Sequence, residues 1–212
     1  GTDASSMVLD KQDHPAILFL LNEAGTYNLL FTRWNGTAWV KADGTGYDPT
    51  SPAETQPIYD RILATNTYQI TEYKLLFDSQ NRPYVAFVRV DEDLMHQNVY
   101  FAYFNGTSWT TAQEISGSPS DWGWSLDFAI DANNRPCVAF AGYIDATDYE
   151  DIYLTCLNNG TWTYANGTTS GWENISQANH ANYPDYPIIV FDNNNRPMVV
   201  WTNDTSNQIA FT

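Results

Sequence analysis

Aromatic and acidic side chains gather in the segments between the predicted strands. The CH faces of sugar rings stack on Trp and Tyr, and sugar hydroxyls bind carboxylates and amides. The sequence therefore predicts a binding site for a glycan or a protein partner. Its candidate residues are Trp122, Trp124, Trp172, Tyr149, Tyr183, Tyr186, Asp121 and Asp148.

A structural role is the alternative for several of these rings. Trp124 and Tyr186 stand immediately before a predicted strand, where a large ring can fill the space between neighbouring sheets. The same alternative stays open for Trp122 and Trp172. The residue types alone do not decide between stacking on a ligand and packing in the core, because the same apolar ring serves both purposes.

Catalysis requires more than plentiful acidic residues. Glycoside hydrolysis uses two carboxyl groups about 5 to 9.5 Å apart, but Asp91, Asp93, Asp145 and Glu150 show no spacing that selects such a pair. A solvated loop is the default interpretation, and calcium ligation by clustered oxygen donors comes next. The three histidines lack the spacing of metal ligands. We therefore expect no catalytic residue, no metal ligand and no cofactor, with calcium as the alternative.

One acidic residue recurs in a repeated turn. Asp10, Asp78, Asp131 and Asp192 each stand five residues before a proline, and the last three turns read Asp-x-x-Asn-Arg-Pro. An Asp at a tight turn commonly caps backbone amides. The repeated Asp is therefore predicted to be structural rather than catalytic.

Apolar strands surround each of these turns. Alternating apolar residues precede the Asp, as in Leu75 and Phe77, and a run rich in β-branched and aromatic residues follows the Pro, as in 84–88. A third strand then leads through Asn-Gly, a strong hairpin signal, to a Trp at position 39, 109 or 162. The unit is a four-stranded antiparallel meander that recurs every roughly 50 to 70 residues.

The repeated unit predicts the fold class. Its second strand is apolar on both faces, which indicates a sheet with other sheets packed on either side. We therefore predict an all-β fold, a β-propeller of four-stranded antiparallel blades, with a β-sandwich as the alternative. Four repeats form one domain, 1–212, and the fourth is incomplete. Their boundaries are about 5–42 for repeat 1, 43–71 for an insert, 72–116 for repeat 2, 124–176 for repeat 3 and 186–212 for repeat 4.

The fourth repeat stops inside its third strand, so the ring is expected to be incomplete. Either residues 2–6 add a short closing strand, or further blades or another chain complete the ring. An open sheet edge invites pairing with other chains. Some form of closure is therefore expected.

Two classes of connection predict where a ligand binds. Short, uniform turns join the first strand to the second and the third to the fourth, whereas the other connections are longer and variable. In an up-and-down sheet the two classes emerge on opposite rims, here named the short-turn rim and the variable rim. Because binding residues concentrate on variable loops held by a rigid scaffold, we place the site on the variable rim. The segment 41–71 is expected there too.

Cys137 and Cys156 are the only cysteines. Alignment of the third unit with the second puts them where Tyr84 and Tyr103 stand, opposite each other across a hairpin. We predict that they are adjacent. A disulfide is favoured over two free thiols if the protein is exported.

The chain is strongly acidic, with 25 Asp and Glu against 9 Lys and Arg and a formal net charge of −16. This charge repels phosphate backbones and anionic membranes, which excludes nucleic acid as a partner. No apolar run approaches the length of a membrane span, and residues 1–3 have neither a basic end nor a hydrophobic stretch. We expect a soluble chain without membrane insertion, either already processed or an excised piece of a longer protein.

The pattern Leu-x-x-Asp-x-x-x-x-Pro-x-Val-x-Phe, followed by Asn-Gly-Thr-x-Trp, resembles repeats of secreted bacterial and archaeal proteins. It is similar to the blades of sialidase-type propellers, over nearly the whole chain except about 41–71. The resemblance implies a propeller that is secreted or at the cell surface. Such blades serve lectins, adhesins, hydrolases and surface coats alike. The Ser-x-Asp-x-Gly-x-Thr-Trp box of sialidases does not occur.

Arginine usage also departs from a sialidase, which needs an Arg cluster that grips a carboxylate. Three of the six arginines, Arg82, Arg135 and Arg196, stand in the repeated turn. We expect them to bridge to a neighbouring blade or to lie on the short-turn rim.

The leading hypothesis is an extracellular, non-catalytic recognition or adhesion module that binds a glycan or a protein partner through aromatic and acidic loops. The first alternative is a structural component of a surface layer, a filament or a multidomain secreted protein. The second is a glycoside hydrolase-like propeller. We expect a binding protein rather than an enzyme.

Overall fold

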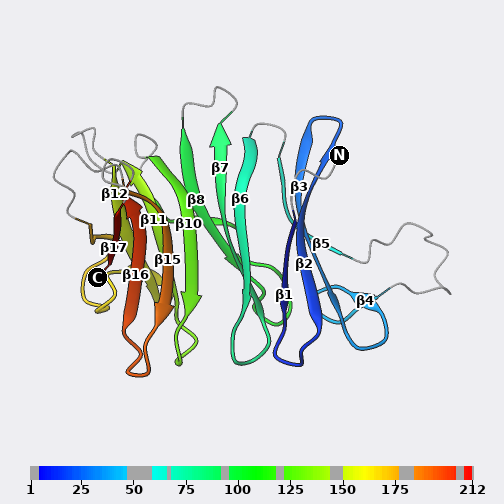
Figure 1. Ribbon diagram of the computed structural model, residues 1–212. Helices are drawn as coiled ribbons and strands as arrows, with labels where there is room; N and C mark the ends of the chain where they lie inside the picture. Colours follow the sequence, from blue (N-terminus) through cyan, green and yellow to red (C-terminus); the bar gives the residue numbers. More distant parts are fainter. Residues whose placement is uncertain are drawn as a thin grey trace.

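The computed structural model describes residues 5–46, 59–65, 68–91, 96–117, 122–143, 150–176, 184–203 and 208–211. Within these ranges every element of regular secondary structure is a β-strand. The strands form four antiparallel sheets in chain order. Figure 1 shows the sheets following one another from the first, at the right, to the fourth, at the left. The same ranges contain no helix that could cross a membrane.

Each sheet pairs strands that are neighbours in the sequence. The first contains β1 (Ser5–Leu9), β2 (Pro15–Glu23), β3 (Thr26–Trp34), β4 (Trp39–Val40) and β5 (Asp60–Thr65). The second contains β6 (Tyr68–Phe77), β7 (Pro83–Asp91), β8 (Gln97–Tyr103) and β9 (Gln113–Glu114). The third contains β10 (Trp122–Ile130), β11 (Pro136–Tyr143), β12 (Asp151–Asn158), β13 (Thr161–Thr163) and β14 (Glu173–Asn174). The fourth contains β15 (Pro184–Phe191), β16 (Pro197–Asn203) and β17 (Gln208–Phe211).

The second strand of each middle sheet is buried on both faces. In β7, Val85 and Phe87 point into the first core, whereas Tyr84 and Ala86 point into the second. Strand β11 divides its side chains in the same way between the second and third cores. This confirms the sequence-based prediction that sheets pack on either side of these strands.

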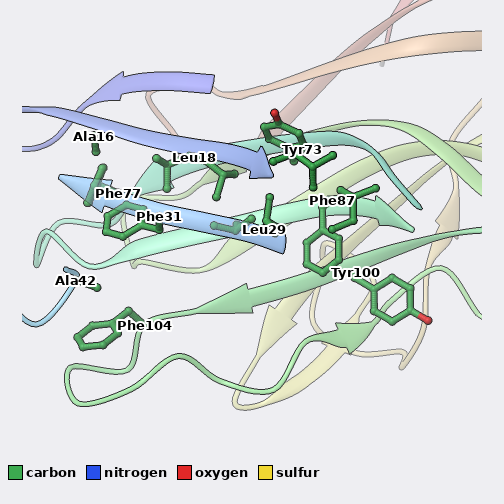
Figure 2. Close-up of a cluster of buried hydrophobic side chains, with 14 residues drawn as sticks. Ala16, Leu18, Leu29, Phe31, Ala42, Tyr73, Phe77, Phe87, Tyr100 and Phe104 are labelled. Carbon is green, nitrogen blue, oxygen red and sulfur yellow. The ribbon is translucent and has the colours of Figure 1, made fainter. Parts of the chain in front are cut away.

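Three hydrophobic cores fill the spaces between successive sheets. The first core holds Phe31 of β3 and Phe87 of β7, both fully buried. Figure 2 shows side chains from the first and second sheets converging on it. Face-to-face packing of this kind fixes the relative positions of the strand ends, and therefore of any site built on the rims.

The repeated Asp caps its own turn. In the second sheet, Asp78 Oδ1 accepts hydrogen bonds from the backbone N–H groups of Gln80 and Arg82, both at 2.9 Å. The Asn before the Arg adopts a left-handed conformation, with φ of 60° at Asn81, which Asn tolerates better than most residues. The predicted structural role of the Asp is confirmed.

The turns of successive sheets are tied together by Asn rather than by Arg. In the first three sheets, the residue after the turn Asp donates its backbone N–H to the turn Asn of the next sheet. The three donor–acceptor pairs are Lys11 to Asn81, Ser79 to Asn134 and Ala132 to Asn195, each at 2.8 Å. We call this series the turn ladder.

The turn arginines bind within their own turns. Arg82, Arg135 and Arg196 each form an ion pair with the Asp four residues earlier, at 2.6 to 2.9 Å. Of the two expectations for these arginines, the position on the short-turn rim (Figure 1) is confirmed, and the bridge to a neighbouring blade is wrong. A guanidinium four residues from a carboxylate across a tight turn reaches it without leaving the turn, so the Arg is already engaged.

Cys137 and Cys156 form a disulfide across β11 and β12. The two residues are direct partners in the strand register, at the place that the alignment with Tyr84 and Tyr103 predicts. Both are fully buried in the third core. The disulfide ties together two strands of the sheet that also carries Trp124.

Of the described residues of the segment 41–71, 60–65 and 68–71 belong to strands and not to a loop on the variable rim as expected, and 47–58, 66 and 67 lie outside the described ranges. Strand β4 pairs with the end of β3, at Arg33 and Trp34, whereas β5 pairs with its beginning, between Tyr27 and Phe31. The fourth strand of the first sheet is therefore divided into β4 and β5. A similar interruption separates β13 from β14 in the third sheet, although both run beside β12. A sequence pattern cannot distinguish a loop within an edge strand from a loop between sheets.

The beginning of the chain belongs to the first sheet. Ser5 and Ser6 pair with Phe19 and Leu18 of β2. The expectation that residues 2–6 close the ring is therefore wrong for its described part, and residues 2–4 lie outside the described ranges. Figure 1 shows the turns from β1 to β2, β6 to β7, β10 to β11 and β15 to β16 together at the lower edge, which is the short-turn rim.

Candidate functional site

The structure places three of the eight candidate side chains. Four candidates lie outside the described residues, namely Asp121, Asp148, Tyr149 and Tyr183. Trp122 begins β10, but its side chain is not among those described. The site is therefore built from Trp124, Trp172 and Tyr186 and from what surrounds them.

The first strands of the second, third and fourth sheets carry a β-bulge near the variable rim. The register of pairing shifts after Ile70 in β6, after Trp124 in β10 and after Asp185 in β15. A bulge bends the strand and re-aims its side chains, and bulges are common next to binding sites. The sequence analysis did not predict them.

Tyr186 stands out from its strand. Its φ is 50°, an unusual value for a bulky residue, and its side chain is 64% exposed. Its backbone N–H donates to Ser125 Oγ of the third sheet at 3.1 Å. Strain of this kind persists only where neighbouring groups hold it, and it is frequent at ligand sites.

The two candidate tryptophans are partly buried instead. Trp124 packs against the third core, with its ring 5.1 Å from that of Tyr143. Trp172 packs against the second core, with its ring 5.7 Å from that of Tyr153. Trp172 precedes β14 at the outer side of the third sheet, separated from β10 by the two strands β11 and β12. The structure therefore does not bring it together with Tyr186.

Charged side chains link the bulged strands to one another. Glu72 Oε2 of β6 accepts the backbone N–H of Leu126 in β10 at 2.9 Å. Asp127 Oδ2 of β10 accepts the backbone N–H of Ile189 in β15 at 3.0 Å. Asp127 Oδ1 also binds Lys74 Nζ of β6 at 3.0 Å. These carboxylates satisfy backbone donors that the strand edges would otherwise leave unpaired.

Burial raises the pKa of the Glu72 carboxyl group, and the negative charges of Asp185 and Asp127 act in the same direction. The hydrogen bond from Leu126 and the charge of Lys74 lower it but do not cancel the effect. Four charged groups from three sheets therefore share one electrostatic environment. We call Glu72, Lys74, Asp127 and Asp185 the inner-strand cluster.

No known family model matches the chain, and no curated protein matches it. Solved structures match it in three dimensions. An endo-arabinase from Bacteroides thetaiotaomicron VPI-5482 superposes with a TM-score of 0.50 at 9% identity, over 99% of this chain and 72% of that one. An α-L-arabinanase from Penicillium chrysogenum, complexed with arabinobiose, gives 0.56 at 10% identity, over 98% and 60%. The chain folds as a β-propeller.

In a propeller each sheet is a blade, and the blades surround a central channel. The first strands β6, β10 and β15, which the inner-strand cluster links, follow one another across the molecule in Figure 1. At such low identity the likeness concerns the fold alone. This chain spans less than two thirds of the length of the arabinanase.

The sequence analysis missed the inner-strand cluster, although a signal was present. Lys74 and Asp127 each stand four residues before the turn Asp, inside a strand that otherwise alternates apolar residues. The fourth blade has Ile188 at the same position. A charged residue at one position of a repeated apolar strand could have been recognised as an exception to the pattern.

A second aromatic group lies in the second blade. The Arg89 guanidinium sits 3.6 Å from the centre of the Tyr68 ring and 4.3 Å from that of Tyr100. The Tyr100 hydroxyl donates to Glu114 Oε2 at 3.0 Å. The group spans all four strands of this blade, from β6 through β7 and β8 to β9, and so it braces the blade internally.

Two depressions lie on the short-turn rim, where no site was predicted. One, of 460 Å³, is lined by His14, Trp34 and Asn81 among others, between the first and second blades. The other, of 480 Å³, is lined by Arg135 and Asn195 among others, between the third and fourth blades. Both lie beside the repeated Asp turn, so the repeat itself creates them.

Across the described ranges, no three His, Cys, Asp or Glu side chains are grouped so that they could hold a metal ion. The acidic segments around Asp93 and Asp145 lie outside those ranges. Calcium ligation there stays a prediction.

Proposed function

We propose that this propeller is an extracellular, non-catalytic glycan-recognition module that binds its ligand on the variable rim at Tyr186. The observation that carries the proposal is an exposed aromatic ring, held in a strained conformation beside the inner-strand cluster. The ring supplies a stacking surface for a sugar, and the charged groups supply hydrogen-bond partners for its hydroxyls.

Two further observations support this choice. The α-L-arabinanase with the same fold is complexed with arabinobiose, so arabinan oligosaccharides are sensible first probes. The Cys137–Cys156 disulfide suits an oxidising compartment, which supports secretion or display at the cell surface. A protein partner at the cell surface would use the same exposed ring and is the other ligand class to test.

A glycan array that includes arabinan oligosaccharides tests the proposal. The chain should bind at least one glycan, and Tyr186→Ala should reduce the signal about tenfold, because stacking of a ring contributes on the order of 1 kcal/mol or more. Trp34→Ala is the matched control, since it removes an aromatic ring on the opposite rim. Loss of binding with the control but not with Tyr186→Ala would move the site to the short-turn rim, and no binding by the unaltered chain would reject glycan recognition.

Glycoside hydrolysis is the second candidate function, because one observation favours it. The raised pKa of Glu72 suits a general acid, and the Asp127 carboxylate, held by Lys74 at 3.0 Å, lies in the same cluster as a second acidic group. In such a reaction Glu72 would give its proton to the leaving glycosidic oxygen. Asp127 would accept a proton from the water that attacks the anomeric carbon.

Turnover separates the two functions. A screen of arabinan oligosaccharides and aryl glycosides should show no hydrolysis if the chain only binds. Hydrolysis that disappears in Glu72→Gln, while glycan binding persists, would establish the hydrolase and reject the non-catalytic proposal. Glu23→Gln, an exposed acid in the first blade, is the control for a general loss of charge.

A further inference from the structure

The turn of the fourth blade has the donor side of the turn ladder, as the turns of the other three blades do. Its turn has the same Asp and Arg, and Asp192 Oδ1 accepts the backbone N–H of Asn194 as the other turns do. The residue after this Asp is Asn193, whose backbone N–H has no partner among the described residues. The equivalent N–H of Lys11, Ser79 and Ala132 is the donor of the turn ladder.

Exposure marks the same turn as different from the others. The Arg196 side chain is 73% exposed, against 31% for Arg82 and 21% for Arg135. The next blade shields the turn ion pair in the second and third blades. The turn of the fourth blade therefore has the residues that join two blades elsewhere in the chain, but it is exposed.

The sheet above this turn is apolar on its outer face. Ile188, Val190, Met198 and Val200 are between 38% and 56% exposed. By alignment of the turn prolines, Met198 and Val200 correspond to Cys137 and Ala139 in the third blade. Cys137 and Ala139 are fully buried against the fourth blade. We call the four exposed residues the outer face of the fourth blade.

We propose that the outer face of the fourth blade docks a further blade of this same repeat type, one whose turn carries Asn at the position that Asn195 holds here. That Asn would accept the N–H of Asn193 and donate to the Asp192 carboxylate. Asn195 does both to the third blade, accepting from Ala132 at 2.8 Å and donating to Asp131 at 3.0 Å. The interface thus continues one that the chain already makes three times.

A second copy of this chain fits the outer face less well. Its own free apolar surface is on the first blade, where Met7 and Leu9 are exposed. The first turn, however, has Asp13 in place of the ladder Asn. An ionised Asp13 could accept the N–H of Asn193, but it could not donate to Asp192 and would bring a second negative charge beside it.

The test adds a blade to the chain. By alignment of the strand pairs, Thr212 corresponds to Thr155 of the third blade, so a copy of residues 156–212, with Cys156→Ser in the copy, continues the strand in register. Hydrogen exchange of the Asn193 amide is then measured by NMR, with the Ala132 amide as the internal reference. We expect exchange of Asn193 to slow about tenfold or more, because its N–H gains an acceptor and loses contact with water.

The matched control carries Asn195→Asp in the copy only, which reproduces the first turn. It should lose most of the protection at Asn193 while the Ala132 amide stays protected. Equal protection with Asn and with Asp in the copy would reject the role of the ladder Asn. No protection of Asn193 in a folded extended chain, judged by its amide spectrum, would reject the docking of a blade.

Light scattering of the unaltered chain tests the same surface without the extension. We expect a monomer, since the proposal gives a second copy no complementary turn. A dimer or larger ring that Val190→Lys dissociates would show that another copy covers the outer face, and would overturn the proposal even if the extended chain failed to fold.

Discussion

At the scale of single residues, the turn Asp and the turn Asn divide the work of the repeat. Asp131 holds its own turn closed, because it accepts the backbone N–H groups of Asn133 and Arg135. Asn195 reaches the same carboxylate from the next blade. One buried carboxylate therefore stabilises both the turn and the junction between two blades.

Asp131→Asn should lower the free energy of unfolding by about 1–3 kcal/mol, because it leaves the Arg135 guanidinium without its counter-charge and loses an acceptor. Asp192→Asn alters the same turn in the fourth blade, where the described chain has no following Asn, and should cost less. Urea unfolding of both variants measures the difference. Equal losses would mean that the junction adds nothing to the turn.

The pH dependence of the Asp131 effect has a definite sign. Burial opposes ionisation, but the hydrogen bonds from Arg135, Asn133 and Asn195 outweigh it and lower the pKa of Asp131. The stability from this group is therefore present above its ordinary pKa of 3.8 and is lost as the pH falls through the lowered value. The gap between the unaltered chain and Asp131→Asn should accordingly narrow in strong acid.

The contribution of Glu72 to stability depends on pH in the opposite direction. Because its pKa is raised in the folded state, its contribution to stability is fully present below the ordinary value of 4.5 and is lost as the pH rises through the raised value. Glu72→Gln should therefore gain stability relative to the unaltered chain as the pH rises above 4.5. Melting temperatures measured across this range check the trend, and a flat difference would contradict the raised pKa.

At the scale of strands and sheets, one glycine lies at a close approach of two blades. Gly123 of β10 lies against the second blade, where an added Cβ would stand 2.8 Å from the Cβ of Ser116 and 3.1 Å from Cγ2 of Val99. Contacts below 3.0 Å force neighbouring groups to move. The variable rim between these two blades therefore depends on a residue without a side chain.

Gly123→Ala should destabilise the protein by about 1–3 kcal/mol, the usual cost of overpacking a well-filled core. Gly46→Ala is the matched control, since Gly46 lies in an exposed turn and its added Cβ would stay 3.2 Å from the nearest atom, a methyl group of Val40. Thermal unfolding compares the two. Similar losses in both variants would show that the blades do not approach as closely as described.

The strands themselves were largely predictable from the sequence. Period-two alternation, the Asp-to-Pro turn and the Asn-Gly hairpins locate the first three strands of each blade, because these local signals have local causes. The pairing of Cys137 with Cys156 followed from the register of the repeat. The features that the sequence did not predict depend on contacts between distant parts of the chain. No residue nearby in the sequence indicates the bulges, or the division of the fourth strand around residues 41–59.

The candidate site was predicted in its residue types but only partly in its arrangement. Tyr186 was chosen as an aromatic residue before a predicted strand. Its exposure depends on a bulge that the sequence does not predict. Glu72 and Asp127 were overlooked because their partners are backbone amides of the next blade. Such contacts exist only once whole sheets have packed. The sequence therefore predicted the rim that carries the candidate site, but not the arrangement of the side chains on that rim.

At the scale of the whole molecule, two ladders hold successive blades together. The turn ladder lies on the short-turn rim, and the links from Glu72 and Asp127 join the first strands of the second, third and fourth blades. Between them lie the three hydrophobic cores. The variable rim is therefore attached to a scaffold that is fixed on both sides, as a preorganised binding site requires.

Titration of the isotope-labelled chain with the glycan that the array selects tests this account most directly. Backbone amide shifts should change at Ser125, Leu126, Tyr186 and Ile189, the residues that join β10 to β15 beside the exposed ring. The amides of the repeated turns should stay unchanged. Shifts confined to the turn 10–14 and to Trp34 would place the ligand on the short-turn rim and contradict the account.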